Sequence, residues 1–445
     1  MSTQENVDYQ LVRQLLEEVA DEITLAKQQR DARLLPELSN ADEQQLAQAM
    51  IVGAVQRHMQ GLLVRGSELP DEAYDQRLCD AVYAAMYGAG ELQELLDDPD
   101  VETIAINGCD EVWITYAGQR GKERGRPIAV NDEDLVNIVQ NLGAYAGLNA
   151  RPFTVASPEL DLRLPDGSRL SAVLGATERP VISIRRNRFP QMFLHRLVEF
   201  GTVDQTLAAF LEAAVLARCN IMVAGATDAG KTTLLRALIN CIPAHERLIT
   251  VERALELGLR HNPDLHWDVV EMEEVLPDAE GRGGITIDQL VRRTRRHNPD
   301  RVIVGEVLGP EVVQMLSAMS QGNDGSLSTI HARDADDVFH KLATYAAQFE
   351  RLDFPVTHSL MASSIDFVVF VRKNPLMDGL RCVTEVVEVT GINEGRVSRS
   401  KIFAESPLDG RAERMSEVAI MRADRLAGSG FNELVPAQWS YAQGV

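Results

Sequence analysis

One short segment, residues 225–233, constrains the fold of this 445-residue chain more than any other feature of its sequence. It reads GATDAGKTT, follows the apolar run 221–224 and precedes a run with helical spacing at 232–240. A buried strand, a glycine-rich turn and a helix, in this order, are typical of a parallel sheet covered by helices. Strand-like and helix-like segments alternate around it, from 205 to 320. The sequence therefore predicts an α/β domain, which we place at residues 202–445 with a C-terminal extension.

The same segment matches the pattern GxxxxGK[ST], which indicates a phosphate-binding loop. Glycines let the backbone wrap closely, so that successive N–H groups point at one anion, and the following helix adds the positive end of its dipole. We expect Lys231 to reach the β- and γ-phosphates of ATP and the Thr232 hydroxyl to ligate Mg²⁺. For Thr233, simple helix packing is the alternative. The residues expected to contact the nucleotide are Gly225, Ala226, Thr227, Asp228, Ala229, Gly230, Lys231, Thr232 and Thr233.

Two glutamates follow apolar strands that are expected in the same sheet. Glu306 comes after the strand 301–304, and Glu252 comes after the strand 248–251. Because functional groups collect at the carboxyl ends of parallel strands, we expect Glu306 to orient the water that attacks the γ-phosphate. Glu252 suits the outer coordination sphere of Mg²⁺ or the positioning of water. Glu256 is either a further candidate or a solvated helix residue.

For His331 and for the arginine-rich stretch 291–301, the sequence allows both a functional and a purely structural role. His331 ends the alternating segment 326–331, where a histidine is more often an ordinary core or surface residue than a sensor. Residues 291–301 hold five Lys or Arg against one acidic residue, in a chain of net charge −22. These arginines form either a solvated helix face or a contact with a neighbouring subunit.

The N-terminal part differs from the predicted α/β domain in its charge and in the periodicity of its apolar residues. Residues 1–92 show helical spacing and carry sixteen Asp and Glu against seven Lys and Arg, which predicts an acidic helical region. Short alternating strands and one helix follow, and we interpret residues 93–190 as a small α+β domain. Residues 187–201 contain Pro190 and show no clear periodicity, so we expect a linker at residues 191–201.

Composition excludes several classes of protein. The negative charge disfavours broad binding to nucleic acid or anionic lipid, and no direct contact with nucleic acid is expected. The five cysteines form no CxxC pair, so neither a zinc site nor a disulfide framework is predicted. The chain shows neither a signal-peptide pattern nor a run of about 18 apolar residues, which predicts a soluble, cytoplasmic protein.

Taken together, several segments resemble the type II/IV secretion ATPases, and most closely the branch of tight-adherence (Flp/Tad) pilus assembly ATPases. In the predicted α/β domain these segments are GATDAGKTT (225–233), LITVERALEL (248–257), EGRGGITI (280–287), NPDRVIVGEVLGPE (298–311) and GNDGSLSTIHA (322–332). Upstream they are ETIAING (102–108), LRLPDGSRLSAV (162–173) and ISIRR (182–186). The resemblance covers roughly residues 90–390, and its blocks occur in the order of the family.

The resemblance implies a hexameric ring of two-domain subunits, each with a RecA-like ATPase domain and a smaller N-terminal domain, and ATP between them. Such rings dock beneath an inner-membrane platform protein and drive pilus assembly or secretion, which implies a location at the inner face of the cytoplasmic membrane. The family's catalytic roles fall on Lys231 of the phosphate loop, Glu252 of the acidic box, Glu306 of the Walker B-type strand, His331 of the γ-phosphate-responsive histidine box, and the N-terminal-domain arginines Arg169 and Arg185. Thr232 and Glu252 are the implied Mg²⁺ residues.

Four positions depart from the family pattern. Arg253 stands where the acidic box usually has Asp, and Leu308 stands where an arginine usually follows the glutamate. Asp228 and Ala229 replace a more common Gly-Ser pair, which places a negative charge near the phosphates. Positioning and charge neutralisation supply most phosphoryl-transfer catalysis, so these changes suggest slower hydrolysis. The alternatives to a secretion motor are a scaffold that binds ATP with little hydrolysis and a conjugation-type DNA-transfer ATPase.

Overall fold

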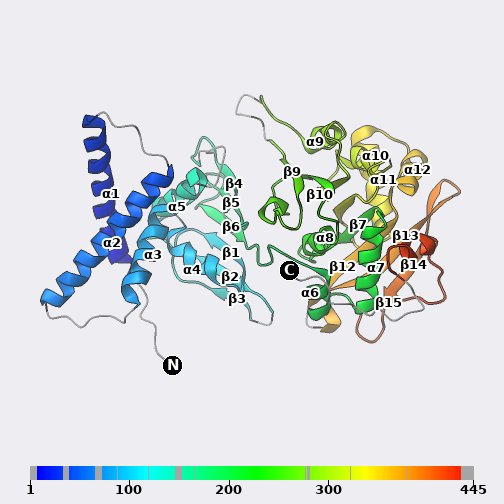
Figure 1. The fold of residues 1–445 in the computed structure, drawn as a ribbon, viewed down its shortest axis with the longest axis horizontal. Coiled ribbons are helices and arrows are strands. Elements are labelled where there is room, and N and C mark those ends of the chain that lie inside the picture. Colours follow the sequence, from blue (N-terminus) through cyan, green and yellow to red (C-terminus); the bar gives the residue numbers. More distant parts are fainter. Residues whose placement is uncertain are drawn as a thin grey trace. The chain divides into compact units, whose positions relative to one another are not determined.

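The chain divides into two compact units, residues 1–188 and 189–445, each described by itself (Figure 1). The computed structural model describes residues 8–33, 40–65, 73–87, 89–118, 120–145, 153–164, 166–275, 277, 281–320, 322–377 and 379–431. The last residues of the predicted C-terminal extension lie outside this set.

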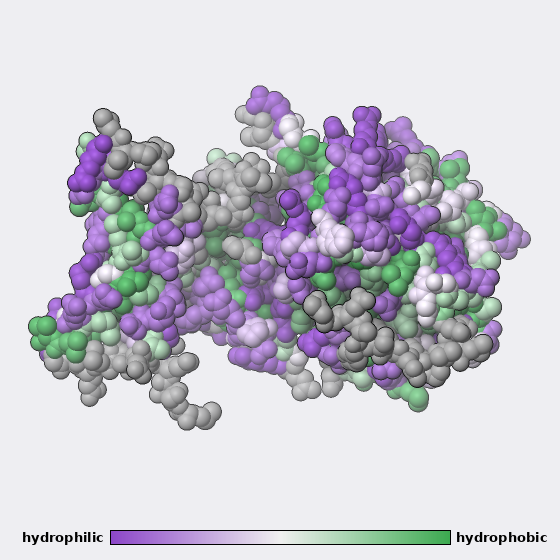
Figure 2. Space-filling model, viewed as in Figure 1, coloured by the Kyte–Doolittle hydropathy of each residue, from purple (hydrophilic) through white to green (hydrophobic). Residues whose placement is uncertain are grey.

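Three helices open the first unit: α1 (Tyr9–Ala32), α2 (Asn40–Arg65) and α3 (Tyr74–Tyr87). Apolar side chains recur along one face of each helix and pack together, among them Leu15, Val19, Ile51, Val55, Leu78 and Val82. Acidic residues lie outside this core, where Arg57 of α2 bridges Glu18 and Glu22 of α1 at 2.7 and 2.6 Å. Figure 2 shows an apolar patch at the end of α2, where Leu63 and Val64 are exposed.

A six-stranded antiparallel sheet follows, in the order β3-β2-β1-β6-β5-β4. Its strands are β1 (Val101–Asn107), β2 (Val112–Tyr116), β3 (Gly121–Arg124), β4 (Glu159–Arg163), β5 (Arg169–Val173) and β6 (Val181–Arg185). The short helices η1 (Gly90–Leu92) and α4 (Gln93–Asp97) precede it, and α5 (Asp132–Tyr145) lies between β3 and β4. Alternate residues such as Ile104, Leu170 and Ile184 are buried, so one face of the sheet forms the core with α5.

The second unit is built on a nine-stranded mixed sheet, in the order β15-β14-β13-β12-β7-β11-β10-β8-β9. Its parallel strands are β7 (Ile221–Gly225), β8 (Arg247–Glu252), β9 (Asp268–Glu273), β10 (Arg301–Val307), β11 (Leu327–His331) and β12 (Phe367–Asn374). The antiparallel strands β13 (Leu380–Asn393), β14 (Arg396–Glu405) and β15 (Ala412–Arg414) extend it beyond β12. The predicted α/β class, with a RecA-like arrangement of parallel strands and helices, is confirmed.

Helices cover both faces of this sheet (Figure 1). On one face α6 (Leu194–Glu199), α7 (Gln205–Leu216), α8 (Lys231–Ile239) and α13 (Ala423–Ala427) share a core with Ile221 and Val223 of β7. On the other face α9 (Ile287–Thr294), α10 (Val312–Ser320), α11 (Asp337–Glu350) and α12 (Phe354–Ser364) share a core with Met222 and Ala224. The short turns η2 (Leu259–His261) and η3 (Pro375–Met377) connect strands. The continuous apolar run of β7 is therefore explained by burial on both faces.

The stretch 191–201, which the sequence suggested as a linker, is not extended chain. It contains α6, whose Leu194 and Leu197 are buried in the core of the second unit together with Met192. A helix of six residues completes fewer than two turns, so its apolar spacing is too short to be recognised as periodic.

Candidate nucleotide site

The phosphate loop joins β7 to α8, and two of its glycines are required by geometry. A Cβ atom at Gly225 would lie 2.2 Å from the carbonyl oxygen of Val371 on β12, so no larger residue fits there. Gly230 has φ 97°, a left-handed conformation that glycine adopts without strain, and it immediately precedes the first residue of α8. The loop is thus packed closely against β12 at its start and makes a left-handed turn directly before α8, and a helix N-terminus at such a position can hold a phosphate.

Lys231, His331 and Glu306 form a chain of contacts at the carboxyl ends of neighbouring strands. Lys231 Nζ donates to the carbonyl oxygen of Ala226 at 2.9 Å and lies 3.0 Å from His331 Nδ1. His331 Nε2 lies 2.7 Å from Glu306 Oε1. Since an ammonium group can only donate, Nδ1 of His331 accepts, and Nε2 carries the proton that is donated to Glu306. Burial and the Lys231 charge lower the pKa of His331, which favours this neutral tautomer.

The topology explains why residues far apart in sequence meet here. His331 is the direct partner of Gly225 in the parallel pair β7–β11, and β10 lies on the other side of β11. The ladder between β10 and β11 is irregular between Val304 and Val307, around Glu306. Two hydroxyl groups of β11 bridge this irregularity, with Ser328 Oγ donating to the Val304 carbonyl at 2.8 Å and Thr329 Oγ1 donating to the Gly305 carbonyl at 2.7 Å. A bulge of this kind re-aims a side chain, in this case Glu306.

Glu252 lies at the end of β8, beside the start of the bulge. A Cβ atom at Gly305 would lie 2.9 Å from Glu252 Cγ, so glycine at 305 leaves room for this side chain. Glu252 is only 3% exposed, and its Oε2 accepts from the N–H groups of Glu256 and Leu257 at 2.8 and 3.0 Å. The carboxylate thus fixes the loop that follows β8, while Glu256 is half-buried and contributes backbone groups to these contacts.

Asp228 occupies the tip of the phosphate loop and is paired with two cations. Its Oδ2 lies 2.5 Å from Lys373 Nζ, and Arg381 Nη2 lies 3.0 and 3.1 Å from the two carboxylate oxygens. The negative charge expected beside the phosphates is therefore neutralised within the second unit. Sequence reasoning missed Arg381 and Lys373, because no local pattern connects the hairpin β12–β13 to a loop some 150 residues earlier.

The other positions that depart from the family pattern have local partners. Arg253 Nε lies 3.2 Å from Glu274 Oε2, and Arg253 is exposed. Leu308 follows the bulge, and Glu311 caps this turn by accepting from the N–H groups of Leu308 and Gly309. Neither Arg253 nor Leu308 belongs to the Lys231–His331–Glu306 chain.

Arg169 and Arg185 lie in the first unit, on adjacent strands. They are direct partners in the antiparallel pair β5–β6, beside Leu170 and Ile184, whose side chains are buried on the opposite face. The structure therefore brings the two arginines together, and their contact with a nucleotide stays a prediction.

The arginines of α9 and of the two residues that follow it are on the surface of the second unit. Arg292, Arg293 and Arg296 are exposed, and Arg295 Nη2 donates to Gln314 Oε1 at 3.3 Å. A solvated face and a subunit contact both remain open for this helix.

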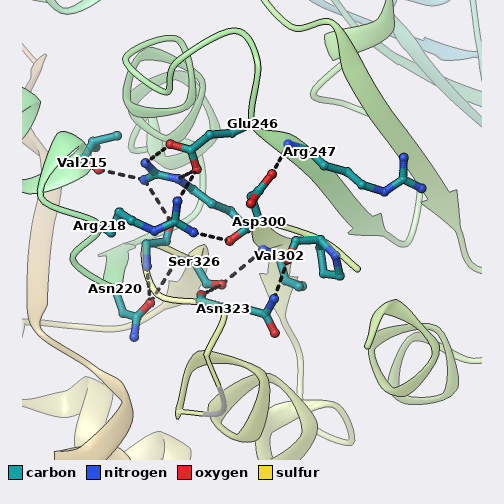
Figure 3. A network of polar contacts seen from close by, with 12 residues as sticks. Val215, Arg218, Asn220, Glu246, Arg247, Asp300, Val302, Asn323 and Ser326 are labelled. Carbon is teal, nitrogen blue, oxygen red and sulfur yellow. Dashed lines mark hydrogen bonds and ion pairs between the residues drawn. The ribbon is translucent and has the colours of Figure 1, made fainter. Parts of the chain in front are cut away.

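A buried polar network holds the opposite, amino-terminal ends of the same strands (Figure 3). Arg301, which is 0% exposed, donates through Nε and Nη2 to the two oxygens of Glu246 at 2.8 Å each, and through Nη1 to the Val215 carbonyl at 2.8 Å. Arg218 Nη1 adds a second contact to Glu246 at 2.8 Å. Burial alone would raise the pKa of Glu246, but Arg301 and Arg218 hold it below its ordinary value. The network fixes where β8 and β10 begin, and thereby where their functional ends lie.

The match to a family model extends over residues 86–411, which is most of the chain, and the model describes a type II/IV secretion system protein. The chain belongs to this family. A putative conjugal transfer protein of Mycobacterium tuberculosis (strain CDC 1551 / Oshkosh) is 33% identical over 71% of this chain and 88% of its own length. Protein VirB11 of Agrobacterium fabrum is 30% identical over 63% of this chain and 87% of its own length.

Among solved structures, the pilus retraction motor PilT with bound ADP resembles the chain with a TM-score of 0.50 and 16% identity, over 66% of this chain and 80% of PilT. At this identity the likeness shows the fold alone. Within the part of the chain that the structure describes, we find no helix that is long and apolar enough to cross a membrane.

Proposed function

We propose that this member of the secretion system family is a Mg²⁺-dependent ATPase that powers pilus assembly or protein secretion. The observation that carries the proposal is the Lys231–His331–Glu306 chain, which connects the phosphate loop to a carboxylate through one histidine. The parts that phosphoryl transfer requires are a phosphate cradle, a positive charge for the β/γ-phosphates and a carboxylate that orients water. All three lie at the carboxyl edge of the parallel strands of the mixed sheet, where α/β proteins bind ligands.

Each member of the chain has a distinct task in this proposal. Lys231 exchanges its contact with His331 for the β- and γ-phosphates when ATP binds. His331 Nε2–H, which donates to Glu306 in this structure, responds to the γ-phosphate. Glu306 is then available to orient the attacking water and to accept its proton. Bound ATP thereby frees the Glu306 carboxylate, which then activates the water that hydrolyses this ATP.

The residues present fit a magnesium ion bound together with the nucleotide. Thr232 lies in the first turn of α8, next to Lys231, and Glu252 lies at the end of β8, at the same carboxyl edge of the parallel strands. Mg²⁺ supplies neutralisation of the phosphate charge when bound, and it is commonly held by one or two protein oxygens together with phosphates and water. In this proposal Thr232 contributes a hydroxyl oxygen, and Glu252 orients water in the outer sphere.

The wider assembly belongs to the same proposal. Residues 93–190 form the domain that brings Arg169 and Arg185 to the phosphates, and residues 1–92 are an acidic helical region. The ATPase region is 202–445. We propose a hexamer at the inner face of the cytoplasmic membrane, docked on a platform protein, and of the tight-adherence (Flp/Tad) branch because of the segments quoted above.

A conjugation-type transfer ATPase is the second candidate, and the relatives support it. One of them is described as a putative conjugal transfer protein. In both candidates ATP turnover moves a cargo through a membrane partner, so they differ in the cargo and share the chemistry. Arg253 and Leu308 favour a third alternative, a scaffold that binds ATP with little hydrolysis.

The decisive experiment measures phosphate release from MgATP by wild type and by Glu306→Gln. We expect the variant to lose turnover and to keep ATP binding, because the amide cannot accept a proton from water. Glu385→Gln is the matched control, since Glu385 is also a strand glutamate with a cationic partner, Lys401 at 2.9 Å, and lies on the antiparallel extension. Binding without turnover in the wild type would favour the scaffold, and equal turnover in Glu306→Gln would show that another group activates water.

A further inference from the structure

The tip of the phosphate loop has a backbone conformation that few residue types adopt. Asp228 has φ 59°, in the left-handed region that side chains other than Gly, Asn and Asp rarely adopt. Aspartate tolerates this conformation, but it also brings a carboxylate to a loop whose ligand is strongly anionic. Something else in the second unit must therefore hold the turn and offset the charge.

Arg381 does both through one planar group. Its Nε donates to the backbone carbonyl of Asp228 at 3.0 Å, while Nη2 contacts both oxygens of the Asp228 carboxylate. The stem of the same side chain packs on the next turn of the loop, since a Cβ atom at Gly230 would lie 3.4 Å from Arg381 Cδ. An arginine can form this forked contact, and a lysine cannot.

The sheet places a second cation at the same point. Lys373 is the direct partner of Arg381 in the antiparallel pair β12–β13, and its Nζ contacts Asp228 Oδ2. Further back on β12, Val371 is the direct partner of Gly225, the residue at which the phosphate loop begins. The hairpin β12–β13 therefore carries two positive charges alongside a loop that contains one negative side chain, and the sum of the three is positive.

We propose that Arg381, assisted by Lys373, is a positioning residue for the nucleotide. It holds the tip of the loop in its left-handed turn and cancels the Asp228 charge, so that the loop's N–H groups and Lys231 act on the phosphates without opposition. This inference rests on the proposed function, because it assumes that ATP binds at this loop.

The test measures equilibrium binding of a fluorescent ATP analogue to the full chain in the presence of Mg²⁺. Arg381→Ala leaves the Asp228 carboxylate less compensated, and we expect the dissociation constant to rise about tenfold, which corresponds to about 1.4 kcal/mol. In an Asp228→Asn background the same substitution should change it less than about threefold, because the charge to be cancelled is gone. Lys401→Ala is the matched control, since it removes one positive charge from an ion pair with Glu385, one strand further out.

The outcomes separate the inference from the proposed function. No binding by the wild type would overturn the proposed function itself. Binding by the wild type together with an Arg381→Ala constant within about twofold of it would overturn only the role of Arg381. A loss of equal size in both backgrounds would also overturn it, because a purely structural role is not relieved by removing the carboxylate. If Arg381→Ala does not fold, Arg381→Gln with and without Asp228→Asn provides the same comparison.

Discussion

The buried pair of Arg301 and Glu246 should make a large contribution to the integrity of the second unit. Replacing Glu246 by Ala removes the acceptor of two hydrogen bonds from Arg301 and of one from Arg218. Arg301 has no access to solvent, so its charge cannot be hydrated in place of the lost contacts. The Val215 carbonyl would remain as its strong acceptor.

The expected loss follows from the burial of both partners. Glu246 is 7% exposed and Arg301 is 0% exposed, and removal of one partner from such a pair costs about 3–5 kcal/mol. For a folded unit of this size, each kcal/mol lowers the melting temperature by about 2–4 °C, so Glu246→Ala should melt roughly 10 °C lower. A double variant, Glu246→Met with Arg301→Met, leaves no buried unpaired charge, because Arg218 is 37% exposed and keeps its contact with the Asp300 carbonyl. The Val215 carbonyl keeps the N–H of Arg218 as a donor, so the double variant should cost less than Glu246→Ala.

Urea unfolding followed by circular dichroism measures these differences. Glu199→Ala is the control, because its partner Arg196 is three residues away on α6 and both side chains are half exposed, 50% and 51%. Exposed pairs of this kind contribute about 0–1 kcal/mol. A loss below about 1 kcal/mol for Glu246→Ala, or a double variant less stable than Glu246→Ala, would refute the argument from an uncompensated buried charge.

Three further predictions concern the nucleotide edge and one buried histidine. Gly225→Ala places a methyl group against the Val371 carbonyl and should abolish binding of the ATP analogue. Gly379→Ala is the control for backbone strain, because φ is 79° there and a Cβ would meet no atom within 4 Å. Normal binding by Gly225→Ala would contradict the close approach of β12. Thr329→Val removes the hydroxyl that donates to the Gly305 carbonyl and thereby loosens the bulge that orients Glu306. We expect the kcat of ATP hydrolysis to fall by a larger factor than KM rises. A change in KM alone would show that the bulge does not orient Glu306. Burial lowers the pKa of His266 to about 4, so the unfolded chain binds a proton at a higher pH than the folded chain does. The contribution of neutral His266 to stability should therefore be fully present above pH 6.5 and be lost as the pH falls toward 4. His266→Gln should reduce this acid-induced decrease in melting temperature. An unchanged dependence of the melting temperature on pH in the variant would show that other groups cause the decrease.

The sequence was sufficient where function depends on consecutive residues. The strand–loop–helix at 221–240 follows from an apolar run, glycines and helical spacing, all within one short continuous segment of the chain. The positions of Glu252, Glu306 and His331 at strand ends also followed from local pattern, since the carboxyl ends of parallel strands share one edge. Strands β12 to β15 were not among the segments predicted from the sequence.

Other features depend on contacts between distant residues, and no local pattern contains them. The Lys231–His331 contact requires β11 beside β7, with direct pairing of His331 and Gly225. The partners of Asp228, Lys373 and Arg381, lie 145 and 153 residues later in the chain, and the sequence alone showed only a charge in an unfavourable place. Arg301 likewise appeared as one of five basic residues in a basic stretch, whereas the fold buries it and pairs it with Glu246.

The sequence by itself therefore determined the phosphate loop, the α/β class and the family, because each is encoded by short-range order along the chain. Only the tertiary structure decided the protonation state of His331, the neutralisation of Asp228 and the burial of Arg301. These depend on distance and desolvation, and both quantities arise when the sheet brings separate strands together.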